Sequence, residues 1–401
     1  MLRITRRDFL KYCSVAAGAL GLSAGTMMKL DNALAKSWQN DGLPVVWISG
    51  AACTGCTVSL ANSRFYTTVD DVLFNYIDLR YLDTLMATAG AQVNGVQVDE
   101  ANSVREAQTT YTTLPYVLAV EGAIPAGTPI DGEKGEYCRI GELVPGDTNE
   151  TMLNVTRKFA AHSNCLAVLG IGTCASFGGI PAAKGNPTDC RGLLYRGTEK
   201  NKGALNDPKL GNGLAGSIDS LGVISKPVIN ISGCPPHPDW IVGTIAHVVD
   251  TMGASIQNVL AGDYTAVLAS LPAVTNYNRP VDYGYKEYQC NAGPCPWRYN
   301  NVQDRNNNSG TTTPDDYYNS RYPEGDSRAL GRNKWKSQDL GCLGILGCKG
   351  RKTKADCSRR RWNTDVAEQY GVNWCVGNRG GCQGCTEPTF PDKVGKFYTF
   401  A

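Results

Sequence analysis

Residues 44–56 read Pro-Val-Val-Trp-Ile-Ser-Gly-Ala-Ala-Cys-Thr-Gly-Cys, an apolar run that leads directly into a Cys-x2-Cys pair. The same order recurs where residues 168–174 read Val-Leu-Gly-Ile-Gly-Thr-Cys and where residues 228–235 read Val-Ile-Asn-Ile-Ser-Gly-Cys-Pro. Such continuous apolar runs are typical of strands buried on both faces of a parallel sheet. Because the carboxyl ends of parallel strands share one edge of a sheet, we expect the cysteines after these strands to converge there. They are Cys53, Cys56, Cys174 and Cys234.

Further strands are predicted at residues 115–120 and 75–82, and helical patterns lie around residues 62–74 and 150–160. Strands that alternate with helices in this way predict a doubly wound parallel α/β sheet over residues 40–270.

One more helix is predicted after Pro238, with Asp239 as its N-cap. Its apolar residues recur at helical spacing and are expected to form one face. They are Ile241, Val242, Ile245, Val248 and Val249.

The composition excludes several classes of function. The chain has 401 residues, with 39 Lys and Arg against 37 Asp and Glu, so its net charge of +2 gives no reason to expect a nucleic-acid partner. Hydrophobic residues make up 42%, which is ample for a core, and the length suggests two domains and leaves room for a third. No apolar stretch reaches the roughly 20 residues of a membrane span, so a soluble mature protein is expected.

The amino terminus resembles an export signal. Residues 5–11 read Thr-Arg-Arg-Asp-Phe-Leu-Lys, an apolar stretch follows to about residue 22, and residues 33–35 read Ala-Leu-Ala. We interpret residues 1–35 as a twin-arginine signal peptide, which would direct the folded protein to the periplasm. Its cleavage would remove Cys13 from the mature chain.

The unusual number is 16 cysteines against 3 histidines. Half of the cysteines lie between residues 290 and 385, in a part of the chain with few apolar runs that needs metal or disulfides at its centre. This part also contains a long polar insertion, residues 298–336. Its cysteines are Cys290, Cys295, Cys342, Cys348, Cys357, Cys375, Cys382 and Cys385.

Four thiolates at one point suit a four-iron cluster or a tetrahedral zinc, and buried disulfides or inert buried thiols are the remaining alternatives. Export of an already folded protein favours clusters that are installed before export. Twelve cysteines would then fill three sites of four ligands each. Cys165 is expected to be a core residue, and Cys138 and Cys190 could be free thiols or a disulfide.

Six motifs in order carry a resemblance to a known family: Cys53-Thr54-Gly55-Cys56, Glu121-Gly122-Ala123-Ile124-Pro125, Gly172-Thr173-Cys174-Ala175, Gly233-Cys234-Pro235-Pro236, Gly347-Cys348-Lys349-Gly350 and Cys382-Gln383-Gly384-Cys385-Thr386-Glu387-Pro388. With them, the chain resembles the small, electron-transferring subunit of nickel–iron hydrogenases over nearly its whole length. His237-Pro238-Asp239-Trp240 and Asn373-Trp374-Cys375 are most similar to the nickel–iron–selenium branch.

The resemblance implies a flavodoxin-like domain, residues 36–275, whose Cys53, Cys56, Cys174 and Cys234 hold a proximal [4Fe-4S] cluster. It implies an irregular, cluster-organised carboxy-terminal iron–sulfur domain, residues 276–401, with medial ligands at Cys357, Cys382 and Cys385 and distal ligands at Cys295, Cys342 and Cys348. The Ni–Fe centre would lie in a large subunit, so no catalytic residue is expected in this chain. A cytochrome of the c type is the expected electron partner.

The sequence departs from the family pattern at three positions. Cys375 stands where the family has proline, which predicts a medial [4Fe-4S] cluster, or [3Fe-4S] if Cys375 does not ligate. Ala292 stands where a distal histidine is usual, and Cys290 is its expected replacement, because the three histidines lie in the first domain. Ala52 stands where a glutamate is common.

Two alternatives stay open. The chain could be a related multi-cluster iron–sulfur subunit of another redox complex. A disulfide- or zinc-stabilised periplasmic binding protein is the other. Because residues 397–401 carry no apolar helix, a heterodimer without a membrane anchor is expected.

Overall fold

The computed structural model describes residues 42–63, 68–73, 77–86, 92–93, 96–97, 103–147, 150–210, 226–260, 277–292, 343, 347–362, 374–378 and 380–392. The predicted signal peptide, Cys13 and the insertion at residues 298–336 lie outside these ranges. The chain divides into two compact units, one of residues 1–283 with 388–390 and the other of residues 284–387 with 391–401. The predicted limits of the two domains, 36–275 and 276–401, remain expectations.

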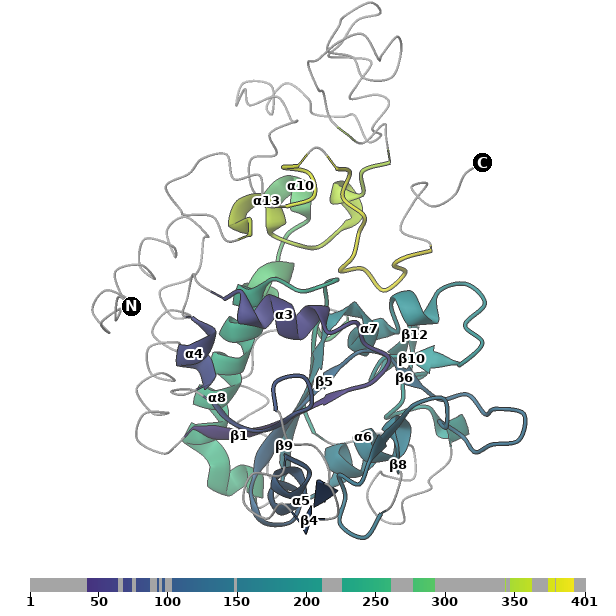
Figure 1. The fold of residues 1–401 in the computed structure, drawn as a ribbon. Helices are drawn as coiled ribbons and strands as arrows, with labels where there is room; N and C mark the ends of the chain where they lie inside the picture. Colours follow the sequence, from purple (N-terminus) through teal and green to yellow (C-terminus); the bar gives the residue numbers. More distant parts are fainter. Residues whose placement is uncertain are drawn as a thin grey trace, which may run out of the picture. The chain divides into compact units, whose positions relative to one another are not determined.

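A parallel sheet of five strands forms the centre of the first unit (Figure 1). Its strands are β1 (Leu43–Ser49), β2 (Ile77–Leu82), β5 (Tyr116–Glu121), β9 (Cys165–Ile171) and β13 (Val228–Ile231). Their order in the sheet is β2-β1-β5-β9-β13, and every neighbouring pair is parallel. This is the strand order of flavodoxin-like folds, so the predicted doubly wound α/β architecture is confirmed.

Burial explains why these five segments are strands. All residues of β5, β9 and β13 are buried, which matches the continuous apolar runs of the sequence. The edge strand β2 is only partly buried: Asp78, Leu79 and Arg80 are half-buried, and the Asp78 and Arg80 side chains pair with each other. The strand order reverses between β1 and β5, and loops that leave the carboxyl ends at such a point form a crevice.

Helices cover both faces of the sheet (Figure 1). Helix α8 (Pro238–Leu260) contacts β9 and β13, whereas α6 (Met152–Ala161) contacts β5 and β9 from the other side. Helix α5 (Ser103–Thr113) packs on β2 and β1. The Thr151 hydroxyl accepts a hydrogen bond from Asn154 N at 3.2 Å and caps α6, so the helix predicted at residues 150–160 is present.

The structure corrects two details of the predicted helices. Helix α8 begins at Pro238, so Asp239 lies inside its first turn, and the Asp239 N–H donates instead to Nδ1 of His237 at 3.1 Å. Residues 240–249 of α8 are buried all round rather than along one face. In the described part of the pattern around residues 62–74, α4 (Val69–Asp71) continues as π-helix over residues 72–73, and the preceding helix α3 (Gly55–Ala61) ends before Asn62.

Small elements complete the first unit. Its antiparallel pairs are β3 (Gln92–Val93) with β4 (Val96–Gln97), β6 (Ile124–Pro125) with β10 (Cys190–Arg191), β7 (Arg139–Gly141) with β8 (Glu150–Thr151), and β11 (Tyr195–Arg196) with β12 (Glu199–Lys200). Its short helices are α7 (Gly172–Phe177), η2 (Ile180–Ala182) and η3 (Pro208–Leu210), and the π-helix η4 (Val281–Tyr285) crosses the unit boundary.

The second unit is built from short turns and helices in its described part. These helices are α10 (Gln289–Ala292), η6 (Gly350–Lys352) and α13 (Cys357–Arg360). Leu343, Trp374, Val376 and Cys382 form a small buried cluster, against which Cys348, Cys357 and Trp362 pack. Within the described residues, none of the helices has the length and hydropathy of a membrane span.

Candidate functional site

Four predicted ligands meet at the carboxyl edge of the central sheet. Cys53 and Cys56 follow β1, Cys174 lies in α7 directly after β9, and Cys234 follows β13. Burial raises the pKa of the Cys56 thiol well above its ordinary value, and the negative charges of Glu121 and of the other three cysteines raise it further. Burial likewise raises the pKa of Cys174 to about 12, with Cys234 and Cys53 among the contributing charges. The four sulfurs are therefore close enough to interact electrostatically, as the sequence predicts.

Glycines bring the backbone against these sulfurs. A Cβ added at Gly172, whose φ is +90°, would lie 2.5 Å from Sγ of Cys56. A Cβ at Gly179, with φ +53°, would lie 2.8 Å from Sγ of Cys174. Because real Cβ atoms do not approach sulfur so closely, only glycine fits at these two positions, and the chain forms a cradle around the thiols.

A buried carboxylate anchors the first cysteine loop. Glu121, at the end of β5, is 1% exposed, and its Oε1 accepts a hydrogen bond from the backbone N of Cys56 at 3.0 Å. Its Oε2 accepts from Thr57 N at 3.2 Å, from Thr57 Oγ1 at 2.6 Å and from Trp47 Nε1 at 3.2 Å. Thr54 precedes α3 with φ +65° and makes no side-chain cap, so Glu121 satisfies the N–H groups of the first helical turn instead. Sequence reasoning noted Glu121 only as part of a motif and missed this role.

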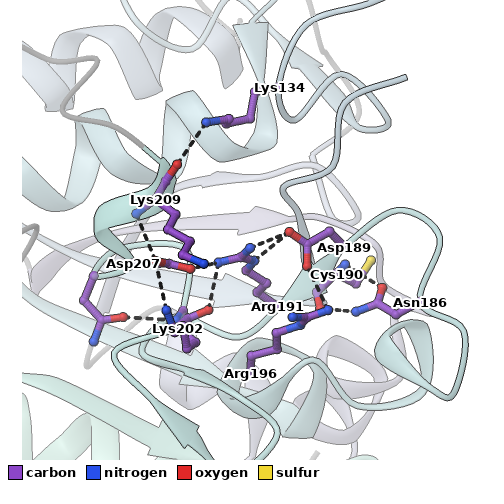
Figure 2. A network of polar contacts seen from close by, with 11 residues as sticks. Lys134, Asn186, Asp189, Cys190, Arg191, Arg196, Lys202, Asp207 and Lys209 are labelled. Atoms are coloured by element: carbon purple, nitrogen blue, oxygen red, sulfur yellow. Dashed lines mark hydrogen bonds and ion pairs between the residues drawn. The ribbon is translucent and has the colours of Figure 1, made fainter. Parts of the chain in front are cut away.

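An ionic network around Arg191 holds the segment that packs against the turn after Cys174 (Figure 2). Figure 2 shows the guanidinium of Arg191 between the carboxylates of Asp189 and Asp207, and the Arg191 side chain is largely buried. Next to it, Cys190 N donates to Asn186 Oδ1 at 2.7 Å. The carbonyl oxygen of Cys190 lies 3.3 Å from where a Cβ at Gly178 would stand. The network thus fixes the backbone that approaches the Gly178–Gly179 turn beside Cys174.

A second group of predicted ligands gathers in the second unit. Burial raises the pKa of Cys357 well above its ordinary value, and the charges of Cys385, Asp356, Cys382 and Cys375 add to this effect. Burial also raises the pKa of Cys382 to about 12. The residue Cys375 itself is exposed, but its charge reaches both Cys357 and Cys382. The structure therefore brings the four predicted medial thiols into one neighbourhood.

Only two of the four predicted distal ligands lie in the described residues. A Cβ added at Gly350 would lie 2.9 Å from Sγ of Cys290 and 3.8 Å from Sγ of Cys348, so both sulfurs face the same glycine. Cys295 and Cys342 lie outside the described residues. The predicted pairing of Cys290 with Cys348 is thus consistent with the geometry, while the full set stays a prediction.

The remaining cysteines and histidines make structural contacts. Cys165 is completely buried in β9, and the described cysteines, Cys138 and Cys190 included, form no disulfide with one another. Nδ1 of His162 accepts from Asn164 N at 3.2 Å, and His247 Nδ1 lies 3.0 Å from the Tyr283 hydroxyl. Within the described ranges, no three His, Cys, Asp or Glu side chains are placed to hold a single metal ion.

The residues present fit an iron–sulfur cluster in their chemistry. Each of the two groups described above offers four thiols, which are the ligands of [4Fe-4S] clusters. Backbone N–H groups point at sulfur: Cys382 N donates to Cys348 Sγ at 3.1 Å, and Gly384 N donates to Cys382 Sγ at 3.4 Å. Such hydrogen bonds are among those that tune cluster potentials.

Comparison with known sequences covers both parts of the chain. Residues 53–248 match a family described as NADH ubiquinone oxidoreductase, 20 Kd subunit, and residues 320–398 match the carboxy-terminal family of NiFe/NiFeSe hydrogenase small subunits. The chain is 32% identical to the periplasmic [NiFeSe] hydrogenase small subunit of Desulfomicrobium baculatum, over 99% of each protein. It is 31% identical to the hydrogenase-1 small chain of Escherichia coli K12, over 99% of this chain and 79% of that one.

Solved structures agree with these matches. The [NiFeSe] hydrogenase of Desulfovibrio vulgaris Hildenborough superposes with a TM-score of 0.60 at 31% identity, over 90% of this chain and 99% of that one. The [NiFeSe] hydrogenase of Desulfomicrobium baculatum gives a TM-score of 0.60 at 29% identity, over 89% of this chain and 99% of that one. With both units matched and the cysteine motifs in order, the chain belongs to the small subunits of NiFe/NiFeSe hydrogenases, and it is part of an oxidoreductase that acts on H2.

Proposed function

We propose that this chain relays electrons between the Ni–Fe centre of a large subunit and a cytochrome of the c type through three [4Fe-4S] clusters. The proximal ligands would be Cys53, Cys56, Cys174 and Cys234, the medial ligands Cys357, Cys375, Cys382 and Cys385, and the distal ligands Cys290, Cys295, Cys342 and Cys348. The observation that carries the proposal is the meeting of four thiols at the carboxyl edge of the sheet, inside a glycine cradle.

The clusters would supply one-electron carriers, and the chain's own residues would bind and tune them. Gly172 and Gly179 leave room for the sulfurs of Cys56 and Cys174. Glu121 holds the loop of Cys56 through the backbone N–H groups that it accepts. The apolar cluster around Trp374 limits the access of water to Cys382, and lower polarity affects the potential of a bound centre.

An exposed surface beside the first group supports the docking of a large subunit. Cys53 is exposed, Val58 in α3 is 54% exposed, and Ile180, which follows Gly179, is 53% exposed. Exposed apolar side chains that gather around a site are typical of an interaction surface. We propose that the large subunit covers this edge, so that its Ni–Fe centre comes near the proximal cluster.

Location and export belong to the same proposal. One relative is a periplasmic hydrogenase subunit by name, and residues 1–35 carry the twin-arginine pattern. We propose export to the periplasm through that pathway. Taken by itself, the match of residues 53–248 would also fit a subunit of another redox complex. The match of residues 320–398 is to hydrogenase small subunits, and it favours a hydrogenase over that alternative.

The experiment is purification of this chain with its large subunit under anaerobic conditions, followed by iron analysis and EPR spectroscopy. The proposal expects about twelve irons per chain, since three four-iron clusters are assigned. It also expects H2-dependent reduction of a c-type cytochrome by the heterodimer and none by the isolated chain. A colourless, iron-free heterodimer that still consumes H2 would contradict the relay.

A further inference from the structure

A buried glutamine amide lies beside the predicted distal ligands and makes no hydrogen bond within the described part of the chain. Gln289, the first residue of α10, is 4% exposed, and its Oε1 accepts from no donor there. Buried side-chain oxygens without a donor are exceptions in folded proteins, because each loses its bonds to water and gains none in return. The unpaired amide therefore points to a partner that the described residues do not include.

The same amide faces the sulfurs of two predicted distal ligands. A Cβ added at Gly350 would lie 3.8 Å from Oε1 of Gln289. The sulfurs of Cys290 and Cys348 lie 2.9 Å and 3.8 Å from that same point, so the three atoms surround it. Gly350 does not have a positive φ, so its backbone conformation does not require glycine. Its missing side chain instead leaves this space to the two sulfurs and the amide.

Hydrogen bonds on both sides of the residue hold the backbone of Gln289. Its N–H donates to the carbonyl oxygen of Thr353 at 2.8 Å, and its carbonyl oxygen accepts from Ser358 Oγ at 2.7 Å. Both Thr353 and Ser358 are buried, so water does not compete for these bonds. The position of the side chain is therefore set by the fold, and the amide is left to turn about its own side-chain bonds.

The orientation of the amide decides which group it presents to the sulfurs. The last side-chain torsion of glutamine is broad and nearly two-fold, so a half-turn exchanges the oxygen and the NH2 group. Ligand sulfurs accept hydrogen bonds, whereas the amide oxygen is itself an acceptor and is repelled by negative charge. A centre held by Cys290 and Cys348 would thus favour the NH2 group of Gln289.

We propose that the side-chain amide of Gln289 donates a hydrogen bond to a sulfur of the distal centre and raises the reduction potential of that centre. This inference rests on the proposed function, because it assumes a cluster at Cys290, Cys295, Cys342 and Cys348. A hydrogen bond to sulfur stabilises negative charge and therefore favours the reduced state. The distal centre would then be a better acceptor of electrons from the medial centre.

The test is an EPR-monitored redox titration of the purified heterodimer with Gln289→Leu, which removes the amide and keeps a side chain of comparable size. The distal signal is identified by its change in Cys290→Ser. The expected result is a more negative distal midpoint at full iron content, with the proximal and medial midpoints unchanged. Gln289→Glu keeps the size of glutamine but has no N–H donor when ionised, and it is expected to shift the distal midpoint in the same direction.

Tyr288→Leu is the matched control, because it changes the neighbouring side chain of the same segment. The Tyr288 side chain is 42% exposed, and its replacement leaves the amide of Gln289 in place. The control is expected to keep the distal midpoint of the unmodified protein. An equal shift in Tyr288→Leu overturns the inference, since any change in this segment would then move the midpoint.

Iron content separates the remaining outcomes. Gln289→Leu with full iron and an unmoved distal midpoint overturns the inference. Loss of about four irons in both variants of Gln289 also overturns it, because a donor to sulfur tunes a bound centre and is not what holds it. If one of the two variants loses iron, the distal midpoint of the other decides. An unmodified heterodimer without a distal signal would contradict the proposed function itself, and the inference would fall with it.

Discussion

The carboxylate of Glu121 accepts a hydrogen bond from the backbone N–H of Cys56 at 3.0 Å, across 65 positions of sequence. This bond ties the end of β5 to the helix that follows β1, at the point where the strand order of the sheet reverses. Fold and site are coupled here, because the same carboxylate satisfies the first turn of α3 and sets the position of a predicted proximal ligand.

Glu121→Gln is expected to destabilise the protein. Glutamine offers one acceptor oxygen where the carboxylate offers two, and its amide nitrogen would face the donors of Thr57 and Trp47. Hydrogen bonds to a charged group contribute roughly 1.5–3 kcal/mol each, so a loss of that order in the unfolding free energy is expected. Urea unfolding of the heterodimer, followed by tryptophan fluorescence, measures it. Glu133→Gln, at an exposed glutamate, is the control, and equal stability of the two variants would count against the role of Glu121.

Gly172→Ala is expected to damage the proximal centre specifically. The new Cβ would lie 2.5 Å from Sγ of Cys56, and the residue has φ +90°. Gly141→Ala is the matched control, since Gly141 has φ +88° but nothing within 4 Å of the added Cβ. Both variants carry the backbone strain of about 1–2 kcal/mol, but only Gly172→Ala should lose iron and the proximal EPR signal. Equal iron contents in the two variants would show that Cys56 is not crowded by this glycine.

The central sheet was predictable because strands buried on both faces read as continuous apolar runs. Residues 165–171 and 228–231 are buried at every position, and the sequence shows it directly. The helix after β1 was not predictable by periodicity. Gly55–Ala61 is short, and its first turn is capped by a residue 64 or more positions away. Because the capping residue is so distant in the sequence, no local sequence pattern marks the start of this helix.

The convergence of the cysteines followed from topology, whereas their detailed environment did not. The shared carboxyl edge of parallel strands predicts that Cys174 and Cys234 meet, since the strands before them, β9 and β13, are neighbours. In the second unit no regular sheet exists among the described residues to place Cys348 against Cys382. Their contact depends on main-chain hydrogen bonds between irregular segments, which no pattern of residue types specifies.

Cys290→Ser is expected to alter the distal centre alone. Sγ of Cys290 faces the same glycine as Sγ of Cys348, and Cys290 is the predicted fourth distal ligand. The variant should slow electron transfer to the cytochrome while H/D exchange at the nickel site continues, because that exchange needs no distal centre. EPR spectra of the proximal and medial centres serve as internal controls. An unchanged distal spectrum with unchanged cytochrome reduction would assign the fourth ligand to another group.

The last prediction concerns Cys375, the predicted fourth ligand of the medial centre. Its charge acts on both Cys357 and Cys382, so the three thiols lie in one neighbourhood, as the proposed four-thiolate medial centre requires. Cys375→Pro removes one thiolate and should convert the medial centre to [3Fe-4S], with about one iron fewer per chain and a higher midpoint potential, because one negative charge is lost. Iron analysis and the EPR signal of the oxidised protein measure both changes.

A matched control separates ligand loss from a general effect of removing a cysteine. Cys165→Ala removes a completely buried thiol from β9, far in sequence from the medial group, and should leave the iron content unchanged. The four-thiolate assignment makes a further demand on the unmodified protein, which must show no stoichiometric [3Fe-4S] signal when oxidised. If that signal is present with about eleven irons per chain, Cys375 is not a ligand of the medial centre.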